Sequence, residues 1–144
     1  IVTGPGYQGY QELFAELQKA EGVSLTHSSG VISSIMEKVQ LAITSNGRTV
    51  YEFAHMNVPS IVIAQHEREI THNFAKEENG LVPLGVYQAK NTEQQVLFSL
   101  DRLVNDNNYR MRLFNAMKSY QFGRNKKLVV NKILRLLDRL DGKN

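Results

Sequence analysis

The chain has 144 residues, of which 42% are hydrophobic and 22% are charged, the size and balance of one ordinary globular domain. It contains no cysteine, which excludes disulfide scaffolds, thiolate zinc sites, iron–sulfur clusters and a cysteine nucleophile. Its longest apolar runs are far shorter than the roughly 20 residues of a membrane-spanning helix, and no charged and then apolar leader opens the sequence. We therefore expect a soluble, cytoplasmic protein.

Short β-branched runs alternate with amphipathic segments over the first part of the chain. The predicted strands are 1–3, 23–27, 41–45, 60–65 and 81–84. The third and fourth are almost continuously apolar, which is typical of strands that are covered on both faces. We expect an α/β, Rossmann-like fold in which about five parallel strands carry helices on both faces of the sheet.

Four helices are expected between these strands, because apolar residues recur three and four positions apart. Their inward residues are Leu13, Phe14 and Leu17; Ile32, Ile35, Met36 and Val39; Val50, Phe53 and Ala54; and Ile70 and Phe74.

After the last strand the pattern is helical only, and residues 89–144 are expected to complete the domain begun by 1–88. Thr92 opens a capping-box sequence, and Asp106 is placed to cap a second helix. Gly123 is expected to break the chain before a third helix over 126–140. The apolar face of that helix is broad enough that it must pack against something.

The net charge of +3 hides an asymmetry along the chain. Residues 1–105 hold 7 basic and 11 acidic side chains, whereas residues 106–144 hold 10 basic and 3 acidic. A basic C-terminal third could attract phosphates, nucleic acid or an anionic membrane surface. It could equally be the solvated face of ordinary helices.

The turn after the third predicted strand holds the first candidate binding residues, because ligands bind beyond the carboxyl ends of strands in open parallel sheets. These residues are Asn46, Gly47, Arg48, Thr49 and Glu52. Gly47 would let a ligand approach the backbone, and the helix start would favour a phosphate to which Arg48 adds a charge. Glu52 could hold a diol such as a ribose. The alternative is a purely structural turn, with Thr49 as the helix cap and Glu52 on a solvated face.

The segment after the fourth strand carries a second polar set. Glu69 and Asn73 are four residues apart and could present acceptors and donors to a hydroxylated ligand. His66 and His72 are six apart, on different helix faces, and do not form a His-Glu-x-x-His motif, so we expect no metal site. Each histidine is more typical of a hydrogen-bonding or surface residue.

The order of these pieces resembles the C-terminal half of GT-B sugar-nucleotide enzymes. The resemblance covers residues 1–88 and is densest over 41–54 (LAITSNGRTVYEFA), 58–64 (VPSIVIA) and the polar segment up to Gly80. It is strongest to spore-coat polysaccharide and pseudaminic-acid pathway proteins that act on UDP-linked sugars. The glycosyltransferase family 28-like N-acetylglucosaminyltransferase of peptidoglycan synthesis is more distant.

What the resemblance implies can be stated residue by residue. The diphosphate would face Asn46, Gly47, Arg48 and Thr49; the ribose hydroxyls would bind Glu52; the sugar would contact Glu69, His72 and Asn73; and the pyrimidine would be read near Ser29. In the family, a glutamine-containing sequence often stands where this chain has 66–69, so the sugar contacts depart most from the family pattern.

The resemblance also implies parts beyond this sequence. A further strand and helix precede the segment that matches residues 1–6 in the family. Without them, 1–3 must pair directly with 41–45 in a 2-1-3-4-5 strand order, or a strand must come from elsewhere, because a central ladder is not left unpaired. We expect an N-terminal domain of the same protein to supply the acceptor site and the catalytic base, and to pack against the final helix.

These observations predict a nucleotide-sugar-binding domain of a glycosyltransferase or UDP-sugar hydrolase in surface polysaccharide or nonulosonic acid biosynthesis. UDP is the expected nucleotide, no cofactor or metal is required, and no catalytic residue is assigned. The basic C-terminal helices could make peripheral membrane contact. The alternative is a non-catalytic, flavodoxin-like binding module whose basic C-terminal helices bind a protein partner or nucleic acid. The basic stretch carries no recognisable nucleic-acid motif, so nucleic acid is not the expected partner.

Overall fold

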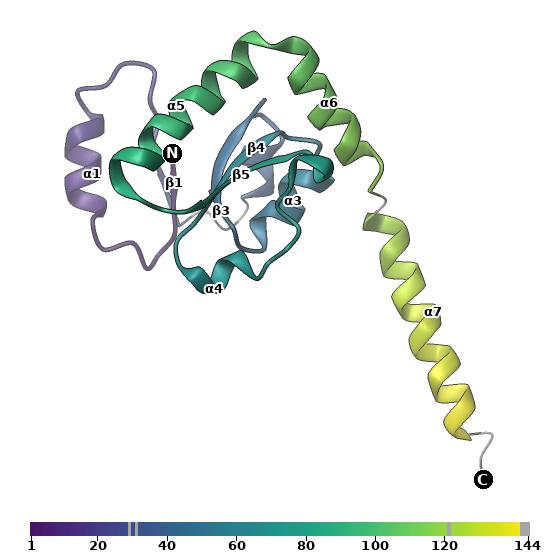
Figure 1. The fold of residues 1–144 in the computed structure, drawn as a ribbon. Coiled ribbons are helices and arrows are strands. Elements are labelled where there is room, and N and C mark those ends of the chain that lie inside the picture. Colours follow the sequence, from purple (N-terminus) through teal and green to yellow (C-terminus); the bar gives the residue numbers. More distant parts are fainter. Residues whose placement is uncertain (29, 31, 121, 142–144) are drawn as a thin grey trace. The chain divides into compact units, whose positions relative to one another are not determined.

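The computed structural model describes residues 1–28, 30, 32–120 and 122–141, with side chains as far as Asp138. The chain divides into two compact units, Ile1–Glu37 and Lys38–Asn144. Each unit combines parallel strands with helices, and the second ends in a long helix (Figure 1). The predicted α/β class with parallel strands and a C-terminal helical extension is confirmed.

The first unit is built around one pair of short parallel strands. Strand β1 (Val2–Thr3) pairs with β2 (Thr26–His27), and the helices α1 (Tyr10–Leu17) and α2 (Ser33–Met36) follow them in the chain. The His27 ring lies 4.5 Å from the ring of Tyr10, and its Nδ1 is 3.0 Å from the Thr3 hydroxyl. These contacts join α1 to the strand pair.

The second unit contains a three-stranded parallel sheet in the order β3-β4-β5. Its strands are β3 (Ala42–Ser45), β4 (Ser60–Ala64) and β5 (Leu81–Val86). The helical elements of this unit are α3 (Thr49–His55), α4 (Glu67–Ile70), the 3-10 helix η1 (Glu77–Asn79), α5 (Ala89–Asn105), α6 (Asn107–Lys118) and α7 (Phe122–Asp141).

Helices cover both faces of this sheet at the central strand β4, as its apolar sequence predicts. The same prediction is wrong for β3, in which Ile43 is 52% exposed. Neighbouring residues of β4 point to opposite faces, because side chains alternate along a strand. Ile61 packs with Leu103 of α5 and Leu113 of α6, whereas Val62 packs with Val50 of α3. All five side chains are almost completely buried. The central strand is therefore the core of the unit.

Helix α6 packs closely against the turn before β5, because a glycine stands at the point of contact. Gly80 has φ +84°, and a Cβ built there would lie 2.6 Å from the carbonyl oxygen of Leu113 and 2.3 Å from Cγ of Met117. Neither distance is possible for a real side chain, so only glycine lets α6 approach this closely. Tyr109, at the start of α6, adds a hydrogen bond of 2.7 Å to Glu77 of η1. Burial and this hydrogen bond raise the pKa of Tyr109 to about 12.

The prediction of one five-stranded sheet is wrong. In the described residues the five strands form a two-stranded and a three-stranded sheet, and β1 pairs with β2 and not with β3. Each of β1 and β2 has two residues, and their backbone bonds, from Thr26 N to Ile1 O and from Ser28 N to Thr3 O, stay within their own pair. The 2-1-3-4-5 order is therefore not formed.

Several helix ends also differ from their predictions. Helix α5 begins at Ala89, so Thr92 is a buried interior residue whose hydroxyl accepts a hydrogen bond of 2.7 Å from the Gln88 N–H. Gly123 lies within α7, because one glycine costs a helix only about 1 kcal/mol and does not stop it. Asp106 caps α6 as predicted, accepting a bond of 2.8 Å from Tyr109 N–H.

Two of the helices between strands are shorter than their apolar spacing predicts. Helix α2 ends at Met36, before Val39, and α4 ends at Ile70, before Phe74. Phe74 packs as a loop residue instead, with its ring 4.5 Å from the ring of Tyr51 on α3. Phe74 is thus half-buried although no helix joins it to Ile70, and Ile70, which is expected to point inward with it, is 49% exposed.

Candidate functional site

A crevice of about 160 Å³ opens beyond the carboxyl ends of β3 and β4, in the position where open parallel sheets bind ligands. Its walls come from the turn after β3, the ends of β4 and β5, and the segment that begins at α4. The lining residues are Asn46, Val62, Ala64, Ile70, His72, Asn73, Ala75, Pro83 and Gly85.

Asn46 joins the two predicted binding segments. Its side-chain Nδ2 donates to the backbone oxygens of Glu69, at 2.8 Å, and of His72, at 3.4 Å. In return, Nδ1 of His72 lies 2.9 Å from the backbone oxygen of Asn46 and donates to it, since a carbonyl oxygen only accepts. The turn after β3 and the segment after α4 are therefore held together by side-chain bonds in both directions.

The remaining polar atom of the Asn46 side chain has no partner among the described residues. Asn46 is 8% exposed, and its Oδ1 is a buried acceptor without a hydrogen bond. Exchanging the positions of Oδ1 and Nδ2 would not give Oδ1 a partner, because the NH₂ group must face the two carbonyl oxygens to which it donates. A buried unpaired acceptor costs about 1–3 kcal/mol, so the crevice has a place for a hydrogen-bond donor at Asn46 Oδ1.

One carboxylate oxygen of Glu69 is already used in a hydrogen bond within its own segment. Its Oε2 accepts a hydrogen bond of 2.8 Å from the backbone N–H of Gln65, just before α4. The half-buried Glu69 contributes its backbone oxygen to the bond with Asn46 and does not line the crevice. By contrast, the exposed side chains of His72 and Asn73 are part of the lining.

The other candidates of the turn after β3 lie outside the crevice lining. Arg48, the residue before α3, and Glu52, in the first turn of α3, are both exposed. Thr49 is the first helical residue, and no side-chain hydrogen bond caps α3, so the predicted structural role of Thr49 as the cap is wrong. Gly47 does not have a positive φ, and a Cβ there would meet Ser45 Oγ at an ordinary 3.7 Å, so the backbone itself does not require glycine.

The crevice also has walls that the sequence motifs missed. Val62 and Ala64 share one face of β4, and the period of two along a strand could have identified them. Pro83 and Gly85 come from β5, where Gly85 has φ +78° next to an irregularity in the β4–β5 register. The predicted base-binding residue Ser29 lies outside the described residues. In the described part of the chain, no three His, Asp or Glu residues gather as metal ligands.

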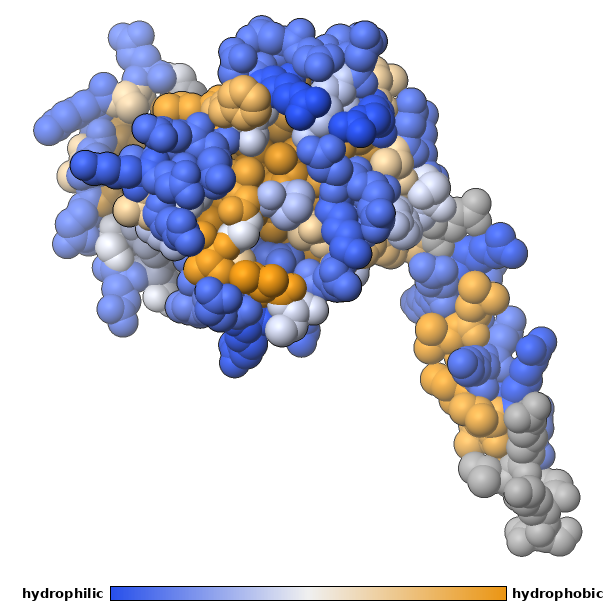
Figure 2. Space-filling model, in the orientation of Figure 1, coloured by the Kyte–Doolittle hydropathy of each residue, from blue (hydrophilic) through white to orange (hydrophobic). Residues whose placement is uncertain are grey.

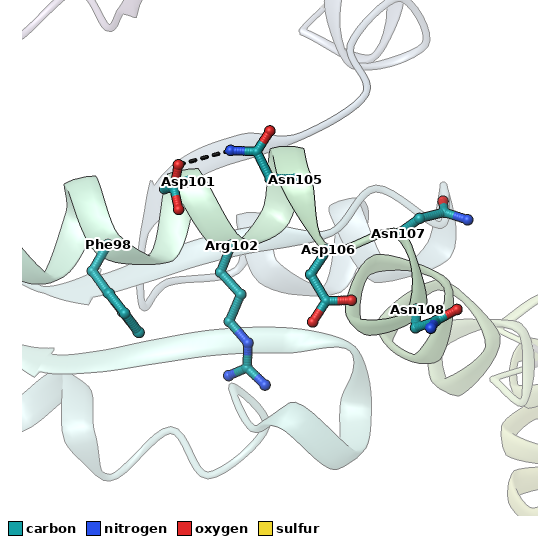
Figure 3. Close-up of a pocket in the computed structure, with 7 residues that line it drawn as sticks. All are labelled: Phe98, Asp101, Arg102, Asn105, Asp106, Asn107 and Asn108. Atoms are coloured by element: carbon teal, nitrogen blue, oxygen red, sulfur yellow. Dashed lines mark hydrogen bonds between the residues drawn. The ribbon is translucent and has the colours of Figure 1, made fainter.

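A second hollow, of about 510 Å³, lies where α5 passes into α6 (Figure 3). It is lined by Phe98, Asp101, Arg102, Asn105, Asp106, Asn107 and Asn108. Its charged groups already have protein contacts: Asp101 accepts from Asn105 at 2.7 Å, and the Arg102 guanidinium lies 3.6 Å from the centre of the Tyr109 ring. Asp106 caps α6. None of its lining residues has a buried, unpaired side-chain polar atom, unlike Asn46 in the crevice.

No protein-family model, curated protein or solved structure matches this chain.

Proposed function

We propose that this chain is the nucleotide-sugar-binding domain of a glycosyltransferase or UDP-sugar hydrolase. The observation that carries the proposal is the buried, unpartnered Oδ1 of Asn46 in a crevice at the carboxyl ends of parallel strands. A sugar is a ligand with many hydroxyl donors, and one hydroxyl would satisfy this acceptor. The resemblance to GT-B enzymes in surface polysaccharide or nonulosonic acid biosynthesis supports the same class of ligand.

The crevice would hold only part of the ligand. Its volume of about 160 Å³ is below the roughly 300–1,000 Å³ of complete small-molecule sites. We assign the sugar to the crevice, where His72 and Asn73 line the wall. Asn46, which the resemblance assigns to the diphosphate, also lines this crevice, so we assign it to the sugar instead. Glu69 supports this part by fixing the loop through its bond to Gln65 N–H.

The nucleotide would extend from the crevice over the turn after β3. In this arrangement Gly47 and Thr49 lie along the diphosphate and the exposed Arg48 supplies a positive charge. Glu52, exposed in the first turn of α3, would accept hydrogen bonds from the ribose hydroxyls. UDP is the expected nucleotide.

The contribution of this domain to the reaction would be electrostatic. Arg48 and the backbone of the turn would stabilise the charge that builds up on the departing diphosphate, which is a large term in such chemistry. The catalytic base and the acceptor site would come from an N-terminal domain of the same protein. No step of this scheme calls for a cofactor.

Calorimetric titration of the 144-residue chain with UDP, CMP and ADP tests the proposal. We expect UDP to bind more tightly than the other two, and Glu52→Ala to weaken it at least about tenfold, because a hydrogen bond to a charged group contributes about 1.5–3 kcal/mol. Glu93→Ala, which removes an exposed carboxylate from α5, is the matched control and should change nothing. Absence of nucleotide binding, or equal effects of the two substitutions, would refute the proposal.

A further inference from the structure

Helix α7 carries an exposed apolar face over residues 128–137 (Figure 2). Seven of its aliphatic side chains are between 47% and 59% exposed. They are Leu128, Val129, Val130, Ile133, Leu134, Leu136 and Leu137. At about 100° per residue, all of these except Leu128 fall within an arc of about 160°. An apolar face of this width is unfavourable in water, so it indicates a binding surface.

The opposite arc of α7 is strongly basic. Among residues 122–138 there are five basic side chains and one acidic one, Asp138. Arg124, Lys127, Lys132 and Arg135 lie on the polar arc, whereas Lys126 lies within the apolar arc, near the helix start and before the first of the exposed aliphatic residues. All five are exposed. The helix thus combines a broad apolar face with a positive one.

An anionic bilayer satisfies both faces at once. A helix lying in the interface of an anionic bilayer buries its apolar face among the acyl chains and keeps its lysines and arginines at the negative headgroups. Nucleic acid would pair with the basic residues but would leave the apolar residues in water. A second copy of α7 would cover the apolar residues but would bring two positively charged helices together.

The helix has the length to lie in a membrane surface but not the composition to cross it. In the described part of the chain, no helix is both long and apolar enough to span a bilayer. At its first turn, Phe122 contacts aromatic rings of the packed part of the unit, with ring centres 5.5 Å from His55 and 6.3 Å from Phe74. We propose that α7 is an interfacial helix that binds this protein to anionic lipid surfaces.

Vesicle flotation with the 144-residue chain tests this inference. Phosphatidylcholine vesicles that contain phosphatidylglycerol should carry the protein, and vesicles of phosphatidylcholine alone should carry at least tenfold less, because charge attraction adds to apolar burial. High salt should release the protein from the anionic vesicles. Failure to bind anionic vesicles, or equal binding to both compositions, would overturn the inference.

Substitutions on the two faces separate lipid from the other occupants. The double variant Lys127→Ala/Lys132→Ala should lower the affinity for anionic vesicles about thirtyfold, since each cation near the surface contributes about fivefold. Ile133→Ser/Leu137→Ser should also lower it more than tenfold. The control Lys38→Ala/Lys90→Ala removes two exposed charges elsewhere and should have no effect.

Two results would show that another partner is the correct one. Loss of vesicle binding in the lysine variant but not in the apolar variant would indicate binding to polyanions in general. A dimer in sedimentation velocity that the apolar variant dissociates, without selective vesicle binding, would indicate a second copy of the chain. Either result would contradict the lipid assignment.

Discussion

Helices α6 and α7 are both basic and amphipathic and follow each other in the chain. The apolar face of α6 is buried, whereas the apolar face of α7 is exposed. Leu113 of α6 is 0% exposed, whereas Leu136 of α7 is 52% exposed. The difference lies in what receives each helix. Gly80, Glu77 and the strand residue Ile61 all contact α6, while the start of α7 contacts aromatic residues through Phe122. An apolar stripe therefore predicts that a face exists but does not identify its partner.

Truncating one leucine on each of the two helices should change the stability by very different amounts. Leu113→Ala should lower the free energy of unfolding by about 3 kcal/mol, because it leaves a cavity in a fully buried site. Leu136→Ala, the same change on the exposed face of α7, should cost less than about 0.5 kcal/mol. Urea unfolding of both variants measures the two values. A large loss for Leu136→Ala would show that α7 is packed in the free protein.

The close packing of α6 against Gly80 can be tested by comparing two glycines that have similar backbone conformations. Gly80 and Gly85 have φ +84° and +78°, but a Cβ on Gly85 would meet nothing within 4 Å. Gly85→Ala should therefore cost about 1 kcal/mol of backbone strain, and Gly80→Ala about 1–3 kcal/mol more, because it collides with Leu113 and Met117. Similar losses in the two variants would contradict the close approach of α6 at Gly80.

The polar contact at the start of α6 predicts a dependence of stability on pH. Burial and the bond to Glu77 raise the pKa of Tyr109 to about 12 from an ordinary value of 10. The folded protein thus keeps this proton at pH values where the unfolded chain loses it. The stabilisation is complete below pH 10 and is lost as the pH rises from 10 to 12.

Comparison with Tyr109→Phe isolates this effect from other groups that titrate in the same range. The stability of the wild-type protein relative to the variant should fall by about 2 kcal/mol between pH 9 and 12, since one pKa unit corresponds to about 1.4 kcal/mol. Urea unfolding at several pH values gives the difference. A difference that does not change with pH would show that Tyr109 is not buried against Glu77.

A smaller change, in ligand affinity and not in stability, is expected at the crevice, which is formed by residues before α7. Asn73 lines the crevice and is exposed, so Asn73→Ala should leave folding intact. We expect this variant to bind a UDP-sugar with about tenfold lower affinity, while its affinity for UDP stays the same, because only the contact with the sugar is removed. Asn115→Ala on α6 is the control. Equal weakening of UDP and UDP-sugar would contradict the assignment of the sugar to the crevice.

The strands of the packed part could be predicted because they are short apolar runs between polar turns. Segments 41–45 and 60–65 agree with β3 and β4 to within one residue at each end. The sheet division and the start of α5 could not be predicted in this way. They depend on which strand edges meet and on a hydrogen bond from Gln88 N–H to Thr92, neither of which local periodicity reports.

The candidate site was predictable in its position but not in its geometry. The rule that ligands bind beyond strand ends led to Asn46 and to His72, which the structure joins by hydrogen bonds. That Asn46 turns inward to the backbone of Glu69, and so leaves its Oδ1 unpaired, follows from two loops approaching through space. The contribution of Pro83 to the crevice has the same origin.

Amide chemical shifts during a titration of the labelled 144-residue chain with a UDP-sugar locate the bound ligand residue by residue. We expect saturable shifts over residues 46–52 and 64–73, around Asn46 and the crevice, and none along α7. An absence of saturable shifts, or shifts confined to α7 or to the hollow between α5 and α6, would rule out a nucleotide-sugar site at the crevice.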